Sequence, residues 1–410
     1  MDTVAHTKYT PSMQARHVAM IHDYFYSYGG AEKTVESWLE LYPDAIVYTN
    51  FITLPNFRGT IFEKLYYSGQ LKVTAEQTLL KSYNPKLFKF LFWLHPIMSR
   101  LGIHIPAKTD LVLLSSVYSA KYAKFPPNIP IIHYCHSPTR FLYSNVMRTE
   151  LDHDSFAWYI KLFTTPAKFL LRIWDQKVVK KLLQSHVVWL ANSSYNQTIT
   201  QKLYHITPAI LYPPVDIHRF FHTVRSVPEM QKGYIVFGRV VPIKKIERAI
   251  IACILTNSPL AILGSISNND YLHYLNKLIV SYPNKKANSL IRFVGDIPDA
   301  EKIVYFSTTK ALLFPGLEDF GIVPIELMAA GIPVISIQGA GALEYIQPGI
   351  NGTFFEEGST ELETIQNLSA VLSNFDPKTI NSNTIKKSVQ HFDHLHIRRL
   401  KKIISKQKLS

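Results

Sequence analysis

Short runs of consecutive hydrophobic residues recur along this chain of 410 residues and alternate with segments of helical spacing. Such runs, when turn residues bound them, are typical of strands buried on both faces of a parallel sheet. A proline-rich segment at 212–228 separates an earlier group of runs from a later one, which indicates two α/β domains. Buried strands are predicted at 17–21, 110–115, 130–134 and 186–191, and then at 234–237, 260–263, 291–294, 311–314 and 334–337.

The run at 311–315 leads into a segment that combines a turn, a helix start and two acidic side chains. Gly321 permits a tight turn, and Pro324 suits the first position of the helix that carries Glu326. The free N–H groups at a helix start favour an anion, whereas the carboxylates of Glu318 and Glu326 accept hydrogen bonds from hydroxyls. A nucleotide-sugar meets both demands, because it has phosphates beside sugar hydroxyls.

The residues around these glutamates resemble a known family. The sequence EDFGIVPIELMAAGIPVI, which begins at Glu318, is similar to the E-x7-E donor-site signature of retaining GT-B glycosyltransferases of family 4. The similarity continues in GAGALEYIQPGINGTFF, and FGRVVPIKKIERAI resembles the basic motif GR-x4-K of that family. GGAE at 29–32, HSPTR at 136–140 and PPVD at 213–216 also fit, so the resemblance extends from about residue 21 to residue 355.

The resemblance implies the GT-B fold, in which two Rossmann-like domains face each other across a cleft. An acceptor domain would span 1–215, a nucleotide-sugar donor domain would span 216–379, and a crossover helix at about 380–410 would return to the first domain. The reaction would retain the anomeric configuration, with attack on the face from which the leaving group departs. Catalysis would depend on stabilising the leaving diphosphate in a closed, dry cleft.

The resemblance also assigns roles to individual residues of the donor domain. Arg239 and Lys244 would bind the donor diphosphate, since their charges can neutralise it without a metal. Glu318 would accept hydrogen bonds from the transferred sugar, and Glu326 from the ribose. Lys245 stands where many relatives have glycine, although a subgroup has a basic residue there. The other expected donor contacts are Phe320, Gly321, Ile322 and Val323.

Two motifs of the first domain complete the predicted site. Gly29 and Gly30 would let backbone N–H groups approach a phosphate, although Glu32 could instead cap the helix predicted at 31–41. His136, at the end of a strand, would lie beside the sugar and the acceptor and would bind a hydroxyl or move a proton. Arg140 would hold an acceptor phosphate or a local carboxylate. The predicted catalytic residues are therefore His136, Arg239, Lys244 and Glu318.

The sequence predicts neither a metal nor another cofactor. Asp152-His-Asp154 spells the DxD of metal-dependent glycosyltransferases, but it precedes the helical run 155–171, whereas a metal-binding DxD follows a strand. The other histidines show no paired ligand spacing with cysteines or carboxylates, which argues against zinc. The two cysteines, Cys135 and Cys253, lie in separate apolar segments and imply no disulfide framework.

The net charge of +14 is unevenly distributed. Residues 1–215 hold 22 Lys+Arg against 13 Asp+Glu, residues 216–377 hold 13 against 16, and residues 378–410 hold 9 against 1. In segments 81–108 and 156–183, aromatic residues alternate with Lys and Arg, as in helices that lie in a membrane interface. Core aromatics with snorkelling lysines, or a solvated basic surface, would also explain this composition.

These observations lead to a specific functional expectation. No recognised nucleic-acid motif accompanies the charge, so we expect an anionic membrane surface rather than nucleic acid as the partner. HSPTR and VPIKKIERAI resemble a mannosyltransferase subgroup, which implies transfer from GDP-mannose, with UDP-sugars still open. The acceptor would be a glycan or a polyprenyl-diphosphate-linked oligosaccharide of cell-surface polysaccharide or lipopolysaccharide synthesis. The protein would be cytoplasmic and peripheral on the inner face of the membrane.

Two other functions fit parts of the pattern. A nucleotide-sugar epimerase can use the same fold, and it would need no second acceptor. A non-enzymatic protein could bind nucleotide-sugars or nucleic acid through the same basic residues. The presence of all four residues Arg239, Lys244, Glu318 and Glu326 argues against a degenerate, merely binding site.

Overall fold

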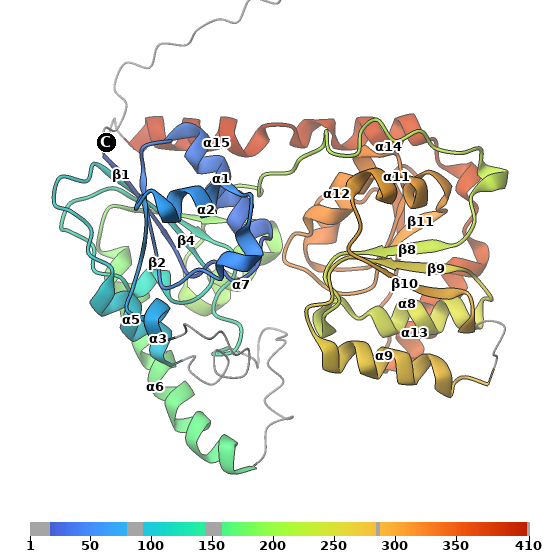
Figure 1. The fold of residues 1–410 in the computed structure, drawn as a ribbon, viewed down its shortest axis with the longest axis horizontal. Helices are drawn as coiled ribbons and strands as arrows, with labels where there is room; N and C mark the ends of the chain where they lie inside the picture. Colours follow the sequence, from blue (N-terminus) through green and yellow to red (C-terminus); the bar gives the residue numbers. More distant parts are fainter. Residues whose placement is uncertain (1–16, 80–92, 144–157, 284–287, 408–410) are drawn as a thin grey trace, which may run out of the picture. The chain divides into compact units, whose positions relative to one another are not determined.

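The computed structural model contains two parallel sheets with helices packed around them (Figure 1). The chain divides into two compact units, the first formed by residues 1–135 and 163–190 and the second by residues 136–162 and 191–410. The domain boundaries predicted at 215 and 379 stay a prediction. The structure describes residues 17–79, 93–143, 158–283 and 288–407.

The first sheet has seven strands in the order β3-β2-β1-β4-β5-β6-β7, and its recorded pairs are parallel. All four strands predicted for it are present within one residue at each end, because each is an apolar run whose residues are largely buried. The sequence pattern missed the short strands β2, β3 and β7, which have no long apolar run. The strands are β1 (Val18–His22), β2 (Ile46–Thr49), β3 (Leu71–Val73), β4 (Leu111–Ser116), β5 (Ile131–Cys135), β6 (Val187–Ala191) and β7 (Ala209–Ile210).

The helices of this part of the chain include one unusually long element. α6 (Trp158–Leu183) has 26 residues and continues well past residue 171, where the sequence pattern predicted its end. No helix in the described part of the chain combines the length and apolar character that crossing a bilayer requires. The other helices are α1 (Gly30–Leu41), α2 (Ile61–Tyr67), α3 (Glu76–Leu79), α5 (Leu94–Gly102) and α7 (Ser194–Tyr204).

The second sheet has six parallel strands in the order β10-β9-β8-β11-β12-β13. The five strands predicted here are confirmed within one residue, and β13 was missed. The strands are β8 (Tyr234–Phe237), β9 (Leu260–Leu263), β10 (Ile291–Gly295), β11 (Ala311–Phe314), β12 (Val334–Ile337) and β13 (Gly352–Phe355). The helices are α8 (Ile246–Leu255), α9 (Asn269–Ser281), α11 (Asp299–Thr308), α12 (Ile322–Ala329), α13 (Glu361–Asn374), α14 (Ser382–Val389) and α15 (Leu395–Gln407).

Helices cover both faces of the second sheet (Figure 1). Alternate residues of β8 enter two different hydrophobic clusters, since successive strand side chains point to opposite faces. Ile235 and Phe237 pack with α11, α12 and α14, whereas Tyr234 and Val236 pack with α8, α9 and α13. The strand order reverses between β8 and β11, and ligands of such sheets bind beyond the carboxyl ends of the strands at this switch point.

Candidate active site

The switch point of the second sheet brings the predicted cation and acid motifs together. The loop with Lys244 follows β8, and the loop with Gly316 and Glu318 follows β11. A Cβ atom on Gly316 would lie 2.4 Å from the carbonyl oxygen of Ile243, so only glycine lets the two loops pass this closely. As a result, Nζ of Lys244 forms an ion pair with Oε1 of Glu318. Both side chains keep partial solvent access, with 17% and 23% of their surfaces exposed.

The second predicted cation and the residue after Lys244 lie on the same edge. Arg239 follows β8 directly, and its side chain is exposed. Lys245 ends the short 3-10 helix Pro242–Lys244 and has φ 52°, a left-handed conformation in which glycine has no steric penalty. Glycine would therefore adopt the conformation of this position without strain.

Helix α12 begins earlier than the sequence pattern predicted. Gly321 takes φ 85° and serves as the N-cap, so the chain is helical from Ile322 and Pro324 is the third helical residue rather than the first. The missing N–H of Pro324 still falls in the first turn, where an amide has no partner within the helix. Among the described residues no side chain caps this helix, and its first turn contains no acidic residue. The start of α12 therefore presents N–H groups and a positive dipole end to an anion.

The second glutamate of the motif has a partner that the sequence analysis did not identify. Glu326 is 2% exposed, and its Oε2 lies 3.8 Å from Nη1 of Arg219. Arg219 also donates from Nε and Nη2 to Asp299, at 2.7 and 3.0 Å. Burial by itself lowers the pKa of Arg219, but the hydrogen bond to Asp299 and the charge of Glu326 raise it above its ordinary value. The only feature of the sequence that could have drawn attention to Arg219 is its position just after the PPVD motif.

The turn before α12 is held by aromatic packing. Phe320 is buried, and its ring stacks on Tyr212 with centroids 5.3 Å apart. The hydroxyl of Tyr345 donates to the carbonyl of Phe320 at 3.0 Å. Burial raises the pKa of Tyr345 well above its ordinary value, and the charges of Glu318 and Glu344 raise it further. Because the Phe320 side chain belongs to the core, a ligand contact at this residue would use its backbone.

The HSPTR segment after β5 is anchored by its backbone. The carbonyl of His136 accepts hydrogen bonds from Nδ2 of Asn192 and Nδ2 of Asn196, at 2.9 and 2.8 Å. Nη2 of Arg140 donates to Oδ2 of Asp319 at 2.7 Å. Arg140 was predicted to bind either an acceptor phosphate or a local carboxylate, and in the structure it binds a carboxylate. The acceptor and catalytic roles of His136 and Arg140 stay predictions.

The glycine loop of the first sheet has its own intramolecular partner. Oε2 of Glu32 accepts a hydrogen bond from the backbone N–H of Gly29 at 2.9 Å, which is the one half of a capping box that a glycine N-cap allows. Oε1 of Glu32 lies 3.6 Å from Nε2 of His22. Glu32 therefore binds the backbone at the start of the helix, as one of the two interpretations of this residue predicted. The phosphate contacts of Gly29 and Gly30 stay a prediction.

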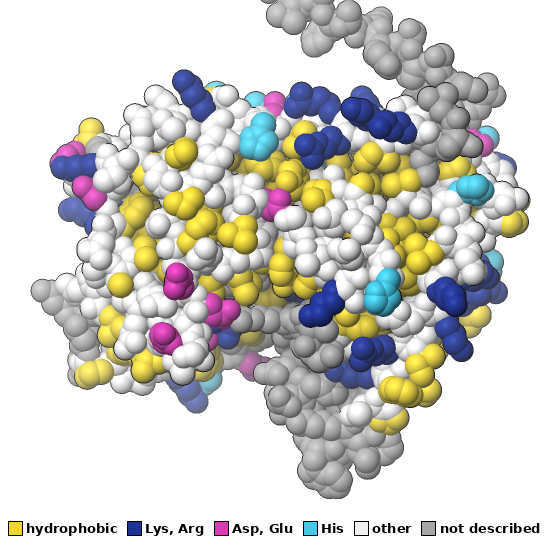
Figure 2. Space-filling view, turned by 180° about the vertical axis from the view of Figure 1, so that it is seen from behind, with side chains coloured by type: hydrophobic (Ala, Val, Ile, Leu, Met, Phe, Trp, Pro, Cys, Tyr) yellow, Lys and Arg dark blue, Asp and Glu magenta, His cyan; other side chains and the backbone are white. Residues whose placement is uncertain are grey.

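The basic aromatic segments are only partly described. Phe169 and its neighbour Leu170 on α6 are 64% and 65% exposed, so the interpretation as core aromatics is wrong for Phe169. Trp174 is half-buried against Tyr122, with ring centroids 4.7 Å apart. For this residue, packing inside the protein explains the aromatic side chain. On the face drawn in Figure 2, Lys and Arg side chains gather over α15. Asp152 and Asp154 lie outside the described residues.

Comparisons with known proteins agree with this fold. Residues 219–377 match the family of group 1 glycosyl transferases. The α-1,3/1,6-mannosyltransferase ALG2 of Saccharomyces cerevisiae is 28% identical over 204 residues, which cover 38% of this chain and 40% of that protein. The chain spans about half the length of the curated relatives it matches.

Solved structures match nearly the whole chain at low sequence identity. Sucrose-phosphate synthase from Thermosynechococcus elongatus has a TM-score of 0.68 at 15% identity and covers 96% of this chain and 100% of its own. Anabaena Alr3699/HepE in complex with UDP has a TM-score of 0.61 at 17% identity, with coverages of 95% and 100%. The two parallel sheets and these structural similarities show the GT-B fold, and residues 219–377 of the chain match the group 1 glycosyl transferases.

Proposed function

We propose that the protein is a retaining hexosyltransferase that transfers mannose from GDP-mannose to a glycan or polyprenyl-diphosphate-linked acceptor in cell-surface polysaccharide or lipopolysaccharide synthesis. The observation that carries the proposal is the pairing of Lys244 with Glu318 beside the uncapped start of α12. A cation, a hydroxyl-binding carboxylate and free helix N–H groups meet there, and a nucleotide-sugar uses all three. The name of the yeast relative supports mannose as the sugar.

The geometry supports a specific exchange of partners when the donor binds. Lys244 would move from Glu318 to the diphosphate, and the Glu318 carboxylate would then accept hydrogen bonds from the sugar hydroxyls. As the leaving diphosphate gains charge, Arg239, Lys244 and the N–H groups of Ile322 and Val323 would stabilise it without a metal.

The remaining residues of the site would bind the ribose and the transferred sugar next to this diphosphate. Glu326 would accept from the ribose, and Arg219 would hold its carboxylate in place. His136 would bind a sugar hydroxyl or move a proton. Transfer would thus require no metal or other cofactor.

The donor proposal can be tested by ligand-induced stabilisation of the intact protein. GDP-mannose is compared with UDP-glucose and with the free nucleotide diphosphates by thermal shift, since a ligand at 100 times its dissociation constant stabilises by about 2.7 kcal/mol. GDP-mannose should give the largest shift, and Lys244→Ala should reduce it. Lys277→Ala, at an exposed position on α9, is the matched control. Equal shifts for wild type and Lys244→Ala, or no shift with any nucleotide-sugar, would refute the assignment.

A transfer assay then separates the enzyme classes. Radiolabelled mannose should move to a polyprenyl-diphosphate-linked acceptor, and full activity should survive excess chelator. Formation of an epimerised sugar without any acceptor would instead indicate the epimerase. A strict requirement for manganese or magnesium would reject the metal-free mechanism.

We also propose that the protein is cytoplasmic, that it binds peripherally to the inner face of the membrane, and that it binds its acceptor there. The exposed Phe169, Leu170 and Ile173 lie on the same helix as Arg172 and Lys177, a combination that suits an anionic interface. Arg172→Glu with Lys177→Glu should reduce co-sedimentation with anionic vesicles, whereas Lys277→Glu should not. Equal binding of the wild type to neutral and anionic vesicles would contradict this part of the proposal.

A further inference from the structure

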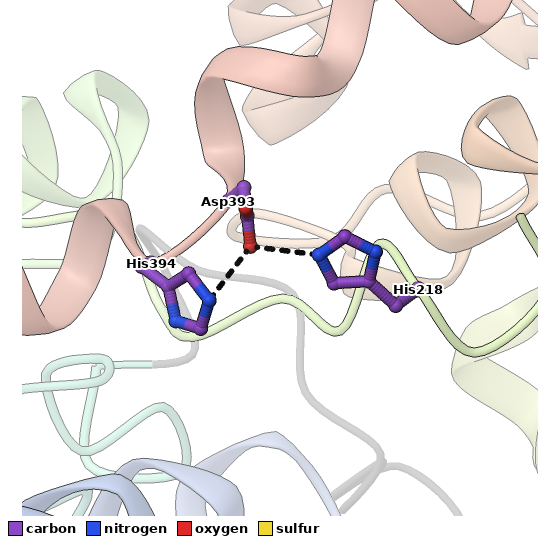
Figure 3. A group of neighbouring side chains, drawn as sticks. All are labelled: His218, Asp393 and His394. Carbon is purple, nitrogen blue, oxygen red and sulfur yellow. Dashed lines mark ion pairs between the residues drawn. The ribbon is translucent and has the colours of Figure 1, made fainter. Parts of the chain in front are cut away.

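Two histidines and an aspartate from distant parts of the sequence meet in the second unit (Figure 3). Nε2 of His218 and Nε2 of His394 each lie 3.3 Å from Oδ1 of Asp393. The three atoms all lie within 4.8 Å of one another. In Figure 3 the two imidazoles approach the carboxylate from opposite sides. In the described part of the chain, no other group of three His, Cys, Asp or Glu side chains is this closely gathered.

The distances suit a four-coordinate zinc ion. Zinc binds histidine nitrogen and carboxylate oxygen at about 2.0–2.2 Å in a tetrahedron, which places neighbouring ligand atoms roughly 3.3–3.6 Å apart. Both separations between histidine and Asp393 already have this length. Two imidazoles with one carboxylate favour zinc over magnesium or calcium, which prefer oxygen ligands. A water molecule can take the fourth position, since His218 and His394 are 63% and 72% exposed.

The backbone on both sides of the cluster is anchored in one hydrophobic core. Ile217 and Phe220 flank His218 and are 3% and 1% exposed. Phe392 precedes Asp393, is 2% exposed, and belongs to the same buried cluster. Ligands held on a rigid backbone lose less freedom when a metal binds. The cluster is therefore preorganised by the core although its side chains are at the surface.

Local turns direct the two histidines. Oδ1 of Asp216 accepts the backbone N–H of His218 at 3.1 Å, which closes the turn that presents this side chain. His394 has φ 49°, an uncommon conformation for a residue other than glycine, and it immediately precedes α15. In the described residues, the ion pairs of the Asp393 carboxylate are with the two histidines, and Nη2 of Arg398 donates to the backbone carbonyl of Asp393 rather than to this carboxylate.

We propose that His218, Asp393 and His394 bind one zinc ion, which ties the segment after the PPVD motif to the turn before α15. None of the three residues belongs to the proposed donor site. The ion would stabilise the fold at this point and would take no part in the transfer chemistry, so the proposal is independent of the metal-free mechanism.

The test measures zinc binding by the intact, metal-stripped protein. Isothermal titration and competition with a chromophoric chelator should give one zinc per chain, and zinc should raise the melting temperature. His218→Gln and His394→Asn should each weaken binding by about tenfold or more, since even partners outside the ligand set have effects of that size. Asparagine at 394 removes the imidazole but tolerates the left-handed backbone. Cobalt bound in place of zinc should show the strong visible absorption of a four-coordinate site.

Matched measurements make the outcome decisive. His273→Gln, at an exposed position on α9, should bind zinc like the wild type. The metal-free melting temperatures of the His218 and His394 variants should match the wild type, because both side chains are exposed. Binding only at millimolar zinc, or undiminished binding by the double variant His218→Gln/His394→Asn, would overturn the proposal.

Discussion

Helices α1 and α12 begin in the same way but differ in whether the first turn contains an acidic side chain. Each follows a glycine beyond the carboxyl end of a strand at the switch point of its sheet, Gly29 after β1 and Gly321 after β11. Glu32 in the first turn of α1 folds back onto the N–H of Gly29. The first turn of α12 contains no acid, and among the described residues neither helix has an N-cap side chain that accepts a hydrogen bond. The strand–glycine–helix pattern thus presents an anion site only where the chain does not supply its own carboxylate.

The loops before the two helices also differ in whether their polar groups already have buried partners within the protein. In the first sheet, the buried Asp23 accepts hydrogen bonds from the backbone N–H groups of Val117, Tyr118 and Ala120, which satisfies the loop after β4 internally. In the second sheet, the corresponding edge holds the part-exposed pair of Lys244 and Glu318. A ligand can exchange partners with an exposed ion pair far more easily than with buried backbone hydrogen bonds, which favours the second edge for the diphosphate.

The largest effect should come from removing both cations of the second edge. Arg239→Ala combined with Lys244→Ala removes two charge-assisted contacts worth roughly 1.5–3 kcal/mol each, so donor affinity should fall by about a hundredfold or more and transfer should cease. The start of α12 alone cannot compensate, since a helix end contributes about 0.3–1 kcal/mol, up to about 2 when partly buried. Calorimetric titration with the donor and a transfer assay measure both results.

The comparison predicts a selective loss in this double variant. Its melting temperature without ligand should stay near that of the wild type, because Arg239 is exposed and Lys244 is only partly buried. Retained donor affinity would mean that the diphosphate binds elsewhere, with the glycine loop before α1 as the next candidate.

A smaller effect should distinguish the two glycines. Gly321→Ala places a Cβ at φ 85°, 2.8 Å from the Tyr345 hydroxyl and 2.9 Å from the Phe314 ring, which should lower stability by about 1–3 kcal/mol and weaken donor binding. Gly29 has φ −150°, and the nearest atom to an added Cβ is Oε2 of Glu32 at 3.3 Å. Gly29→Ala should therefore be nearly neutral in urea denaturation. Equal losses in both variants would remove the distinction between the helix starts.

Removing the cap of α1 sharpens the comparison further. Glu32→Ala leaves the Gly29 N–H without its carboxylate, and the loss of this hydrogen bond lowers stability by about 0.5–1.5 kcal/mol. Donor affinity should change little if the diphosphate binds at α12. A clear gain in affinity would show instead that the uncapped start of α1 binds a phosphate, as the sequence motif of Gly29 and Gly30 implies. Thermal denaturation and donor titration provide the two readouts.

The smallest effect concerns the left-handed residue beside Lys244. Lys245→Gly should relieve the strain at φ 52° and lose the ion pair with Glu247 at 3.6 Å. Because glycine also makes the unfolded chain more flexible, the net gain in stability should not exceed about 1 kcal/mol. Donor affinity should be unchanged, as Lys244 keeps its place. A loss of stability would indicate that the Lys245 side chain contributes more than its backbone strain removes.

Much of the fold followed from hydrophobic runs alone. The nine predicted strands are present because each is a short apolar segment that needs burial on both faces of a parallel sheet. Edge and near-edge strands such as β3 and β13 were missed, since their sequences mix polar and apolar residues. The start of α12 was placed too late because Pro324 also fits the third helical position, and only the φ of Gly321 distinguishes the two cases.

The predicted site shows the same division. Spacing within a motif places Glu318 and Glu326 on either side of one helix start, so the sequence could indicate both. It could not indicate that Arg219 reaches Glu326, because their segments become neighbours only through packing. The three ligands of the proposed zinc site were missed for the same reason, since His218 lies far along the chain from Asp393 and His394.

The sequence by itself determined the α/β class, the positions of most strands, the family resemblance and the residues of the donor motif, because each is encoded in neighbouring residues. Only the tertiary structure decided which chemical groups have partners. It joined Lys244 to Glu318 through the close passage at Gly316, and Arg219 to Glu326. It also brought together His218, Asp393 and His394. Hydrogen bonds and ion pairs act over a few ångströms, so they depend on which distant segments the burial of apolar side chains places side by side.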